Sequence, residues 1–251
     1  MKNNLTMRNI KLIIEYDGKD YKGWQKQPTK LNIQGEIEKA IETVTGKQTE
    51  LIGSGRTDAG VNALAQVANF KTNSKIETNK IPYALNSQLK KSIRIKSAEE
   101  VDENFHSRYG CKRKTYQYVI NNTEQGTAIY RNIQYHFPIY LNEDKMNEAV
   151  KYLIGQHDFK SFKASGTSNK NSVRTIYDAR VWRDGDLIKI QLTGNGFLYN
   201  MIRIISGTLV DVGIGKIQPA QVKEIMNSKD RANAGKTLPA CGLCLISVEY
   251  D

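Results

Sequence analysis

The chain alternates short strand-like runs with single amphipathic helices, and it does so twice along its length. In the first half, residues 8–16 and 65–70 have the pattern of strands, and 33–44 carry apolar residues at helical spacing. In the second half, a hairpin pattern at 173–193 precedes an apolar helical pattern at 198–212. Strands joined by turns, with helices between sets of strands, predict an α+β fold with a mainly antiparallel sheet and flanking helices.

The remaining elements complete two similar halves. Further strands are expected at 93–95, 115–120 and 245–250, and further helices at 81–89, 143–154 and 220–227. Because each half has strands and one main amphipathic helix, we expect two similar subdomains around a central cleft. We place the N-terminal subdomain at residues 1–107 and the C-terminal subdomain, which completes the cleft, at 108–251.

The excess of basic over acidic residues indicates a polyanionic partner. Lys and Arg number 37 against 26 Asp and Glu, which gives a formal net charge of +11, and the excess is spread along the chain. A folded cationic surface favours binding of a polyanion, because phosphate contacts release counterions. The alternative is a basic surface without a polyanionic partner.

No apolar run approaches the roughly 18 residues of a membrane span. The first residues lack the apolar stretch of a signal peptide, so we expect a cytoplasmic protein without a membrane partner.

Cysteine usage and missing motifs argue against disulfide-stabilised, zinc-dependent, P-loop and serine-hydrolase proteins. Three cysteines cannot form a closed disulfide framework, which agrees with a reducing compartment. Cys241 and Cys244 have C-x-x-C spacing but run into a strand-like segment, so packing is favoured over zinc or redox chemistry. The sequence has no complete P-loop and no G-x-S-x-G elbow, and its three histidines are scattered. We therefore expect no metal site.

A glycine-rich loop carries the densest candidate chemistry. Residues 53–61 read GSGRTDAGV, and the glycines allow close approach to a ligand or a positive φ. Arg56 and Asp58 are two apart and would share a face of an extended chain. A nearby guanidinium favours an ionised carboxylate, which can act as a nucleophile. A surface turn with a charge pair is the alternative interpretation, and an aspartic-protease dyad would need a second such loop.

The segment GRTDAGV at 55–61 resembles the signature loop of the tRNA pseudouridine synthase A family. Other segments resemble the same family in the same order: 15–18, 21–25, 105–108, 114–118, 157–162, 196–203 and 242–250. The resemblance therefore covers almost the whole chain. It implies the pseudouridine synthase fold and the isomerisation of uridine to pseudouridine at positions 38, 39 and 40 of the tRNA anticodon stem-loop.

The resemblance also implies roles for four residues. Asp58 falls on the catalytic aspartate, and Tyr116 falls on the tyrosine that stacks on the target uracil. Arg203 falls on the arginine that pairs with the catalytic carboxylate, and Arg56 falls on the loop arginine that helps displace the target nucleotide. The family implies a homodimer, tRNA as partner, and neither cofactor nor metal.

The reaction suits these residue types. The glycosidic bond breaks, the uracil rotates, and C5 bonds to C1′, without net redox change or an external group donor. Asp58 can supply either a nucleophile or a base that deprotonates the ribose, and the sequence does not choose between them. Phosphate contacts are expected from a set of basic residues, of which we expect about half to bind: Lys19, Lys22, Lys26, Lys71, Lys90, Lys91, Arg108, Lys112, Arg113 and Lys114.

Two positions depart from the family pattern. Asn62 stands where the family usually has His, and Asn does not titrate near neutral pH, so it has no general-base role. Residues 90–92 read KKS where the family tends to have Pro and an acidic residue. These departures concern the range of RNA positions rather than the reaction. The alternatives are a synthase with a narrowed or different RNA substrate, and a catalytically silent RNA-binding protein.

Overall fold

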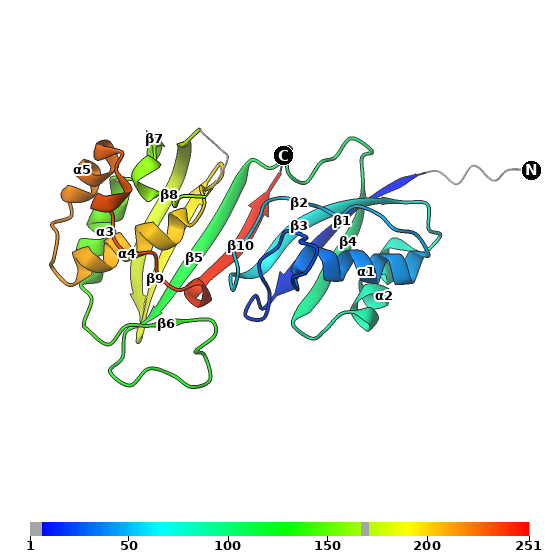
Figure 1. Ribbon diagram of the computed structural model, residues 1–251, viewed down its shortest axis with the longest axis horizontal. Helices are drawn as coiled ribbons and strands as arrows, with labels where there is room; N and C mark the ends of the chain where they lie inside the picture. The colour runs from blue at the N-terminus through cyan, green and yellow to red at the C-terminus, as the bar shows by residue number, and fades with distance from the viewer. Residues whose placement is uncertain (1–6, 167–170, 251) are drawn as a thin grey trace, which may run out of the picture. The chain divides into compact units, whose positions relative to one another are not determined.

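The computed structural model of the chain describes residues 7–166 and 171–250 (Figure 1). The first six residues, where the sequence shows no signal-peptide pattern, lie outside the described residues. The chain forms two compact units, one of Met1–Lys112 with Ile246–Asp251 and the other of Arg113–Leu245. Both units combine mainly antiparallel strands with helices, which confirms the expected α+β class.

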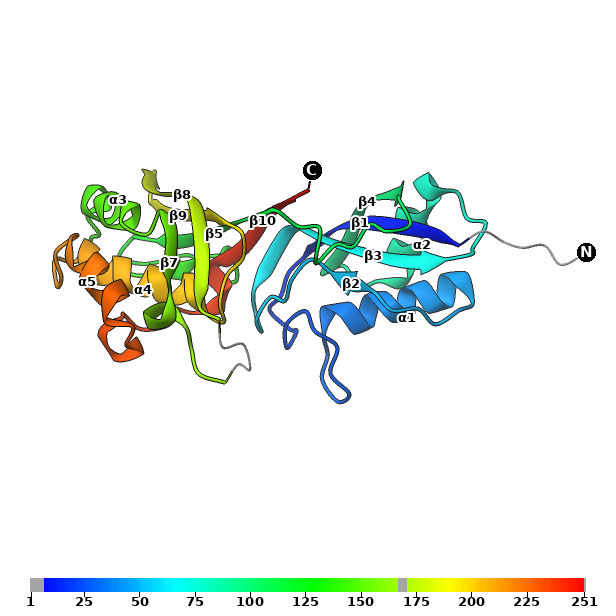
Figure 2. The same ribbon diagram turned by 90° about the horizontal axis from the view of Figure 1, so that it is seen from above.

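The first unit is a small antiparallel sheet with helices. Its elements are β1 (Arg8–Tyr16), α1 (Ile33–Thr45), β2 (Ile52–Gly53), β3 (Asn62–Thr72), the 3₁₀ helix η1 (Thr78–Lys80), α2 (Ile81–Gln88) and β4 (Ile93–Val101). The strand order is β4-β1-β3, and β2 pairs with β3. Ile10 of β1 lies opposite Phe70 of β3, and both side chains are buried. Figure 2 shows α1 running along one face of this sheet.

Helix α1 forms because its sequence supplies both ends and one apolar face. The Asn32 side chain accepts a hydrogen bond from the Gly35 N–H, which satisfies a free donor of the first turn. Gly46 ends the helix in the left-handed conformation at φ 72°. Ile37 and Ile41, four residues apart, are fully buried. The helical spacing over 33–44 predicted this helix, and the structure confirms it.

The second unit is a larger sheet whose described residues also form three α-helices and three short 3₁₀ helices. Its elements before the hairpin are β5 (Arg113–Asn121), β6 (Tyr135–His136), α3 (Glu143–Lys151), β7 (Gly155–Asp158) and η2 (Lys160–Phe162). The hairpin and later elements are β8 (Val173–Asp184), β9 (Leu187–Gly194), α4 (Met201–Gly213), α5 (Gln221–Ser228), η3 (Arg231–Asn233) and η4 (Ala240–Gly242). The strand order is β5-β9-β8-β7, all antiparallel, and β6 pairs with β5 in parallel. Helix α3 packs on β8 and α4.

Strand β10 (Leu243–Glu249) contains the second boundary between the units. Its last residues, with Tyr250, belong to the first unit, and so do residues 108–112, whereas the sequence-based division placed both segments in the second. Hydrogen bonds explain this membership. The Lys112 N–H donates to the Glu249 carbonyl at 2.9 Å, and the Tyr250 hydroxyl donates to the Ser107 carbonyl at 2.6 Å.

Two predicted helices have different limits in the structure. Helix α4 begins at Met201 rather than Leu198, because Asn200 adopts the left-handed conformation at φ 58°. Helix α3 ends at Lys151, and Ile154, expected on its buried face, is 41% exposed. The short strands β2, β6 and β7 were not predicted. No helix among the described residues has the length and apolar character needed to cross a membrane.

Candidate active site

The loop that carries Asp58 connects β2 to β3 and is fixed first through Ser54. The Ser54 N–H donates to the Val67 carbonyl at 2.7 Å, and its hydroxyl bonds the side-chain oxygen of Gln66 at 2.6 Å. The amide of Gln66, which is fully buried, donates in turn to the Gly55 carbonyl at 3.1 Å. Because buried amides are costly to leave unpaired, these bonds tie the start of the loop to β3.

Thr57 fixes the backbone next to Asp58. Its carbonyl accepts a hydrogen bond from the Trp24 N–H at 3.1 Å, and its hydroxyl lies 2.8 Å from the Tyr16 hydroxyl in a buried contact. On the other side, the Gly60 N–H donates to the Tyr21 carbonyl at 3.3 Å. The half-buried Asp58 is therefore held on both sides by the segment that follows β1.

Glycines let the segment after β1 approach the loop closely. Gly23 has φ +94°, and a Cβ there would lie 2.6 Å from the Thr57 carbonyl oxygen. A Cβ on Gly18 would lie 2.1 Å from the Val61 carbonyl oxygen. Both distances are shorter than real Cβ contacts, so only glycine fits without a backbone shift.

Asn62 closes the base of the loop. Its side-chain oxygen accepts a hydrogen bond from the Gly18 N–H at 2.9 Å, and the residue is buried. The residue that departs from the family pattern thus joins the start of β3 to the turn after β1. Through this bond, the Asn62 side chain satisfies a backbone N–H of the turn after β1.

Arg56 and Asp58 differ in exposure, although they are two residues apart. The segment around them belongs to neither a strand nor a helix; Arg56 is exposed and Asp58 is half-buried. The Arg56 guanidinium donates from Nε to the Gln25 side-chain oxygen at 2.8 Å. This bond uses only the Nε donor of the guanidinium group, which has four further N–H donors on Nη1 and Nη2.

Tyr116 lies in the second unit, on β5 opposite Leu192 of β9. Only 8% of the residue is exposed. Its ring meets that of Phe197 edge to face, with centroids 5.4 Å apart and an interplanar angle of 83°. The phenyl ring therefore helps to set the plane of the tyrosine ring.

Arg203, also in the second unit, anchors the chain before β10. Its Nε donates to the Leu238 carbonyl at 2.6 Å, and its Nη1 donates to the Asn200 side chain at 2.7 Å. Nearby, the Tyr118 hydroxyl donates to the Pro239 carbonyl at 2.7 Å, and burial raises the pKa of Tyr118. Arg203 thus holds a backbone segment and keeps part of its guanidinium for other partners.

The cysteine pair has packing contacts. Cys241 lies in η4 and Cys244 in β10, and the Cys241 thiol lies 3.6 Å from the Gln134 carbonyl. Burial raises the pKa of the Cys241 thiol, which disfavours the reactive thiolate. Within the part of the chain that the structure describes, no group of three or more His, Cys, Asp or Glu side chains is placed to hold a metal ion.

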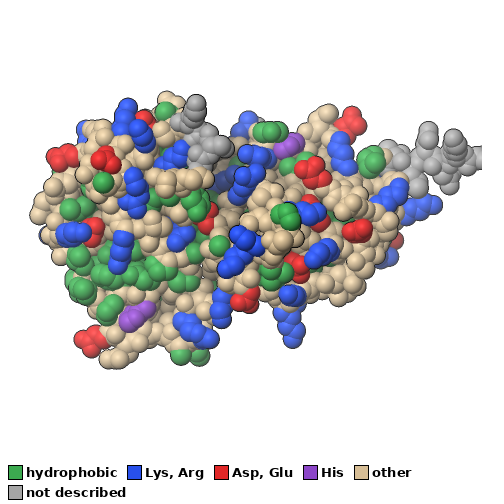
Figure 3. Space-filling model, viewed as in Figure 1, with side chains coloured by type: hydrophobic (Ala, Val, Ile, Leu, Met, Phe, Trp, Pro, Cys, Tyr) green, Lys and Arg blue, Asp and Glu red, His purple; other side chains and the backbone are tan. Residues whose placement is uncertain are grey.

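Basic side chains are scattered over the visible surface of each unit rather than gathered in one stripe (Figure 3). Several of the residues expected at phosphates have side-chain partners inside their own unit. Lys26 forms an ion pair with Glu38 at 2.7 Å, and the guanidinium groups of Arg108 and Arg113 lie 6.0 Å and 5.0 Å from the centres of the Tyr109 and Tyr177 rings. The other candidates remain predictions.

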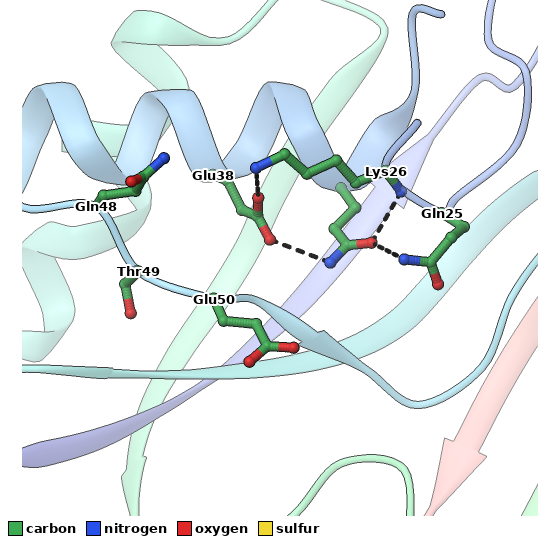
Figure 4. A pocket seen from close by; sticks show the side chains of 7 residues that line it. Gln25, Lys26, Glu38, Gln48, Thr49 and Glu50 are labelled. Atoms are coloured by element: carbon green, nitrogen blue, oxygen red, sulfur yellow. Dashed lines mark hydrogen bonds and ion pairs between the residues drawn. The ribbon is translucent and has the colours of Figure 1, made fainter. Parts of the chain in front are cut away.

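A polar groove of about 570 Å³ lies in the first unit (Figure 4). Its lining consists of Gln25, Lys26, Gln34, Glu38, Gln48, Thr49 and Glu50. Gln25 connects this groove to the Asp58 loop, because it is the hydrogen-bond partner of Arg56. The sequence pattern did not point to Gln34 or Glu38, and it included Gln25 only as the last residue of the segment 21–25 that resembles the family.

Comparison with known proteins identifies the chain. The family model described as tRNA pseudouridine synthase matches residues 12–110 and 149–251. The chain is therefore a pseudouridine synthase, an isomerase with the α+β fold described above. Within that class it belongs to the tRNA pseudouridine synthase family, as its sequence had predicted.

Curated relatives match over nearly the full length. The tRNA pseudouridine synthase A of Caldicellulosiruptor bescii is 52% identical over 244 residues, which are 97% of this chain and 100% of that protein. That of Acetivibrio thermocellus is 50% identical with the same coverage. A Clostridium perfringens protein named tRNA pseudouridine synthase A 2 is 52% identical, again over 97% of this chain and 100% of that protein.

Proposed function

We propose that this enzyme converts uridine to pseudouridine at positions 38, 39 and 40 of the tRNA anticodon stem-loop, with Asp58 as the reacting group. Membership of the tRNA pseudouridine synthase family carries the proposal. The bracing of the Asp58 loop on both sides supports it, because a reacting group must be held in one geometry.

The chemistry assigns Asp58 a place at the junction of sugar and base. The C1′–N1 bond breaks, the uracil turns, and C5 bonds to C1′; the C5 proton then leaves and N1 gains one. The Asp58 carboxylate acts on the sugar-base unit as a nucleophile, or takes a proton from the ribose as a base. Either role requires the ionised form, which a partnering guanidinium favours.

Arg203 is the guanidinium we assign to that carboxylate. Two of its donors hold Leu238 and Asn200, which fixes the orientation of the side chain. The Nη2 group is not used in these bonds and suits a carboxylate. An arginine already anchored at two points loses little conformational entropy when it pairs.

The target base must leave its helix before it can react, at a cost of a few kcal/mol. We assign Arg56 to the displacement of the nucleotide and Tyr116 to stacking on the extruded uracil. Stacking on an aromatic ring returns about 1–3 kcal/mol. Phe197 supports the stacking role, because its ring limits rotation of the tyrosine plane.

Lys and Arg exceed Asp and Glu by eleven charges, which suits a polyanionic substrate such as tRNA. We further propose that the enzyme acts as a homodimer in the cytoplasm. Light scattering on the purified protein tests the first point: a mass near twice 28.4 kDa is expected, and a monomer would overturn it.

Mapping of pseudouridine in total tRNA tests the substrate assignment. Cells that lack the protein should lose pseudouridine at positions 38–40 and retain it elsewhere, and the plasmid-borne gene should restore it. Loss at only one of the three positions would indicate a narrowed substrate range. Unchanged tRNA with a loss in another RNA would overturn the assignment to tRNA.

A further inference from the structure

A chain of side-chain hydrogen bonds within the first unit leads from the exposed Arg56 to a buried carboxylate, and Figure 4 shows its part from Gln25 to Glu38. Arg56 Nε donates to Gln25 Oε1 at 2.8 Å, and Gln25 Nε2 donates to Gln34 Oε1 at 2.9 Å. Gln34 Nε2 then donates to Glu38 Oε1 at 3.1 Å. Gln34 and Glu38 are 7% exposed and Gln25 is half-buried, so an exposed arginine is tied to a buried carboxylate.

Groups that can only donate or only accept a hydrogen bond determine which end of each glutamine amide faces which neighbour. Glu38 accepts from the Leu51 N–H at 3.1 Å and from the Lys26 ammonium at 2.7 Å, and the pKa of Lys26 is raised by this bond. An ionised carboxylate only accepts, so Gln34 must present its NH₂ group to Glu38. The same NH₂ group donates to the Leu51 carbonyl at 3.0 Å, which also only accepts.

The other end of the Gln34 amide is fixed in the same way. The backbone N–H of Lys26, which only donates, reaches Gln34 Oε1 at 3.0 Å. Gln25 must therefore present its NH₂ group to that oxygen, and its own carbonyl oxygen faces Arg56. Had either amide turned over, Arg56 would face a second donor instead of an acceptor.

We propose that Gln25 is a positioning residue that orients the Arg56 guanidinium toward the target nucleotide, and that buried Gln34 and Glu38 set the direction of the Gln25 amide. The role rests on the function proposed for Arg56. Arginine has many rotamers, so an acceptor at Nε reduces the entropy lost when Nη1 and Nη2 meet RNA. Gln25 acts through Arg56 and need not touch the RNA itself.

A double-mutant cycle tests this role. Gln25→Met keeps the length of the side chain but removes the acceptor, and Arg56→Met removes the group it orients. With saturating enzyme and one turnover of tRNA, Gln25→Met should slow pseudouridine formation about tenfold, which corresponds to about 1.4 kcal/mol. In the Arg56→Met background, the same change should have no further effect on the rate.

A second variant tests the buried part of the chain. Glu38→Gln keeps the shape but lets the side chain at position 38 donate as well as accept, so the direction of Gln34, and through it that of Gln25, is held only by the Leu51 carbonyl and the Lys26 N–H. Glu38→Gln should slow pseudouridine formation in the parent and have no further effect in the Arg56→Met background. This pattern is expected even if Glu38→Gln lowers the melting temperature. Gln48→Met is the matched control, because Gln48 is exposed, lines the same groove and has no drawn bond in Figure 4; its rate should equal that of the parent.

The outcomes separate this inference from the function on which it rests. Equal rate losses from Gln25→Met with and without Arg56, or no loss at all, would overturn the positioning role. A parent-like rate for Arg56→Met would overturn the role of Arg56 itself. The inference holds only if both single variants are slow and the double variant is no slower than Arg56→Met.

Discussion

At the scale of single residues, the Asp58 loop depends on backbone atoms that approach more closely than side chains allow. Gly23 and Gly18 lie against the carbonyl oxygens of Thr57 and Val61. The Asn62 side chain adds a hydrogen bond to the Gly18 N–H. The neighbours of Asp58 thus keep its backbone in place, while its side chain remains half-buried. A rigid backbone suits the catalytic role proposed for Asp58, because catalysis needs one well-held geometry.

Gly23→Ala tests this close approach. The new Cβ combines an unfavourable φ with a clash against Thr57, so we expect a loss of about 1–3 kcal/mol in the free energy of unfolding and a slower reaction. Gly46→Ala is the control, because Gly46 also has positive φ but has no atom within 4 Å of a new Cβ. Denaturant unfolding should show the larger loss of stability in Gly23→Ala. Turnover assays should show a loss of rate in Gly23→Ala and none in Gly46→Ala. Equal effects of the two changes would count against the clash.

The candidate residues of this site came from the sequence, and their roles remain proposals. The glycine-rich pattern pointed to the loop, and the family resemblance pointed to Asp58, Arg56, Tyr116 and Arg203. The partners came only from the structure: Gln25 reaches Arg56 from 31 residues away, and glutamines in polar segments carry no pattern of their own. Asn62 marked a departure in the sequence, and the structure gives its amide a bond to Gly18.

At the scale of elements, apolar periodicity predicted the strands and helices well where an element has one buried and one exposed face. Strand β1 and helix α1 are such elements. The short strands β2, β6 and β7 have two to four residues, too few for a period to show. The start of α4 was misplaced because the left-handed Asn200 follows an apolar run that continues the helical pattern.

One pH dependence belongs to the contact between α3 and β8. Arg183 of β8 donates to Glu143, the first residue of α3, at 3.1 Å, and this bond lowers the pKa of the Glu143 carboxyl. A lowered folded-state pKa stabilises the fold above the unfolded value of 4.5 and loses that effect as pH falls through the folded value. Glu143→Gln should cost about 0.5 kcal/mol at pH 7, a modest figure because the pair is partly exposed.

Unfolding of the parent and of Glu143→Gln at several pH values measures this difference. The gap between the two proteins should be constant from pH 7 to about 5 and should close below pH 4.5. Arg183 also bonds the Leu141 carbonyl, so Glu143→Gln is a cleaner change than replacement of the arginine. A gap that widens as the pH falls would contradict the assigned direction of the shift.

At the scale of the whole molecule, a net charge of +11 suits a substrate held mainly through its phosphates. Because phosphate contacts release counterions, affinity for tRNA should fall on the order of a hundredfold between 50 and 200 mM salt for about five contacts. Filter binding or fluorescence anisotropy over this range measures the slope, with the melting temperature followed in the same buffers as a control. A flat response would remove the role given to the basic surface.

In the proposed function, the Asp58 carboxylate performs the isomerisation while other groups bind the RNA. Single-turnover conversion of the anticodon stem-loop uridines by Asp58→Ala, measured beside its tRNA affinity, tests this most directly. Asp144→Ala, an exposed aspartate in α3, serves as the matched control and should behave as the parent. Asp58→Ala should bind tRNA with nearly parental affinity and form no pseudouridine; measurable turnover by this variant would contradict the role proposed for Asp58.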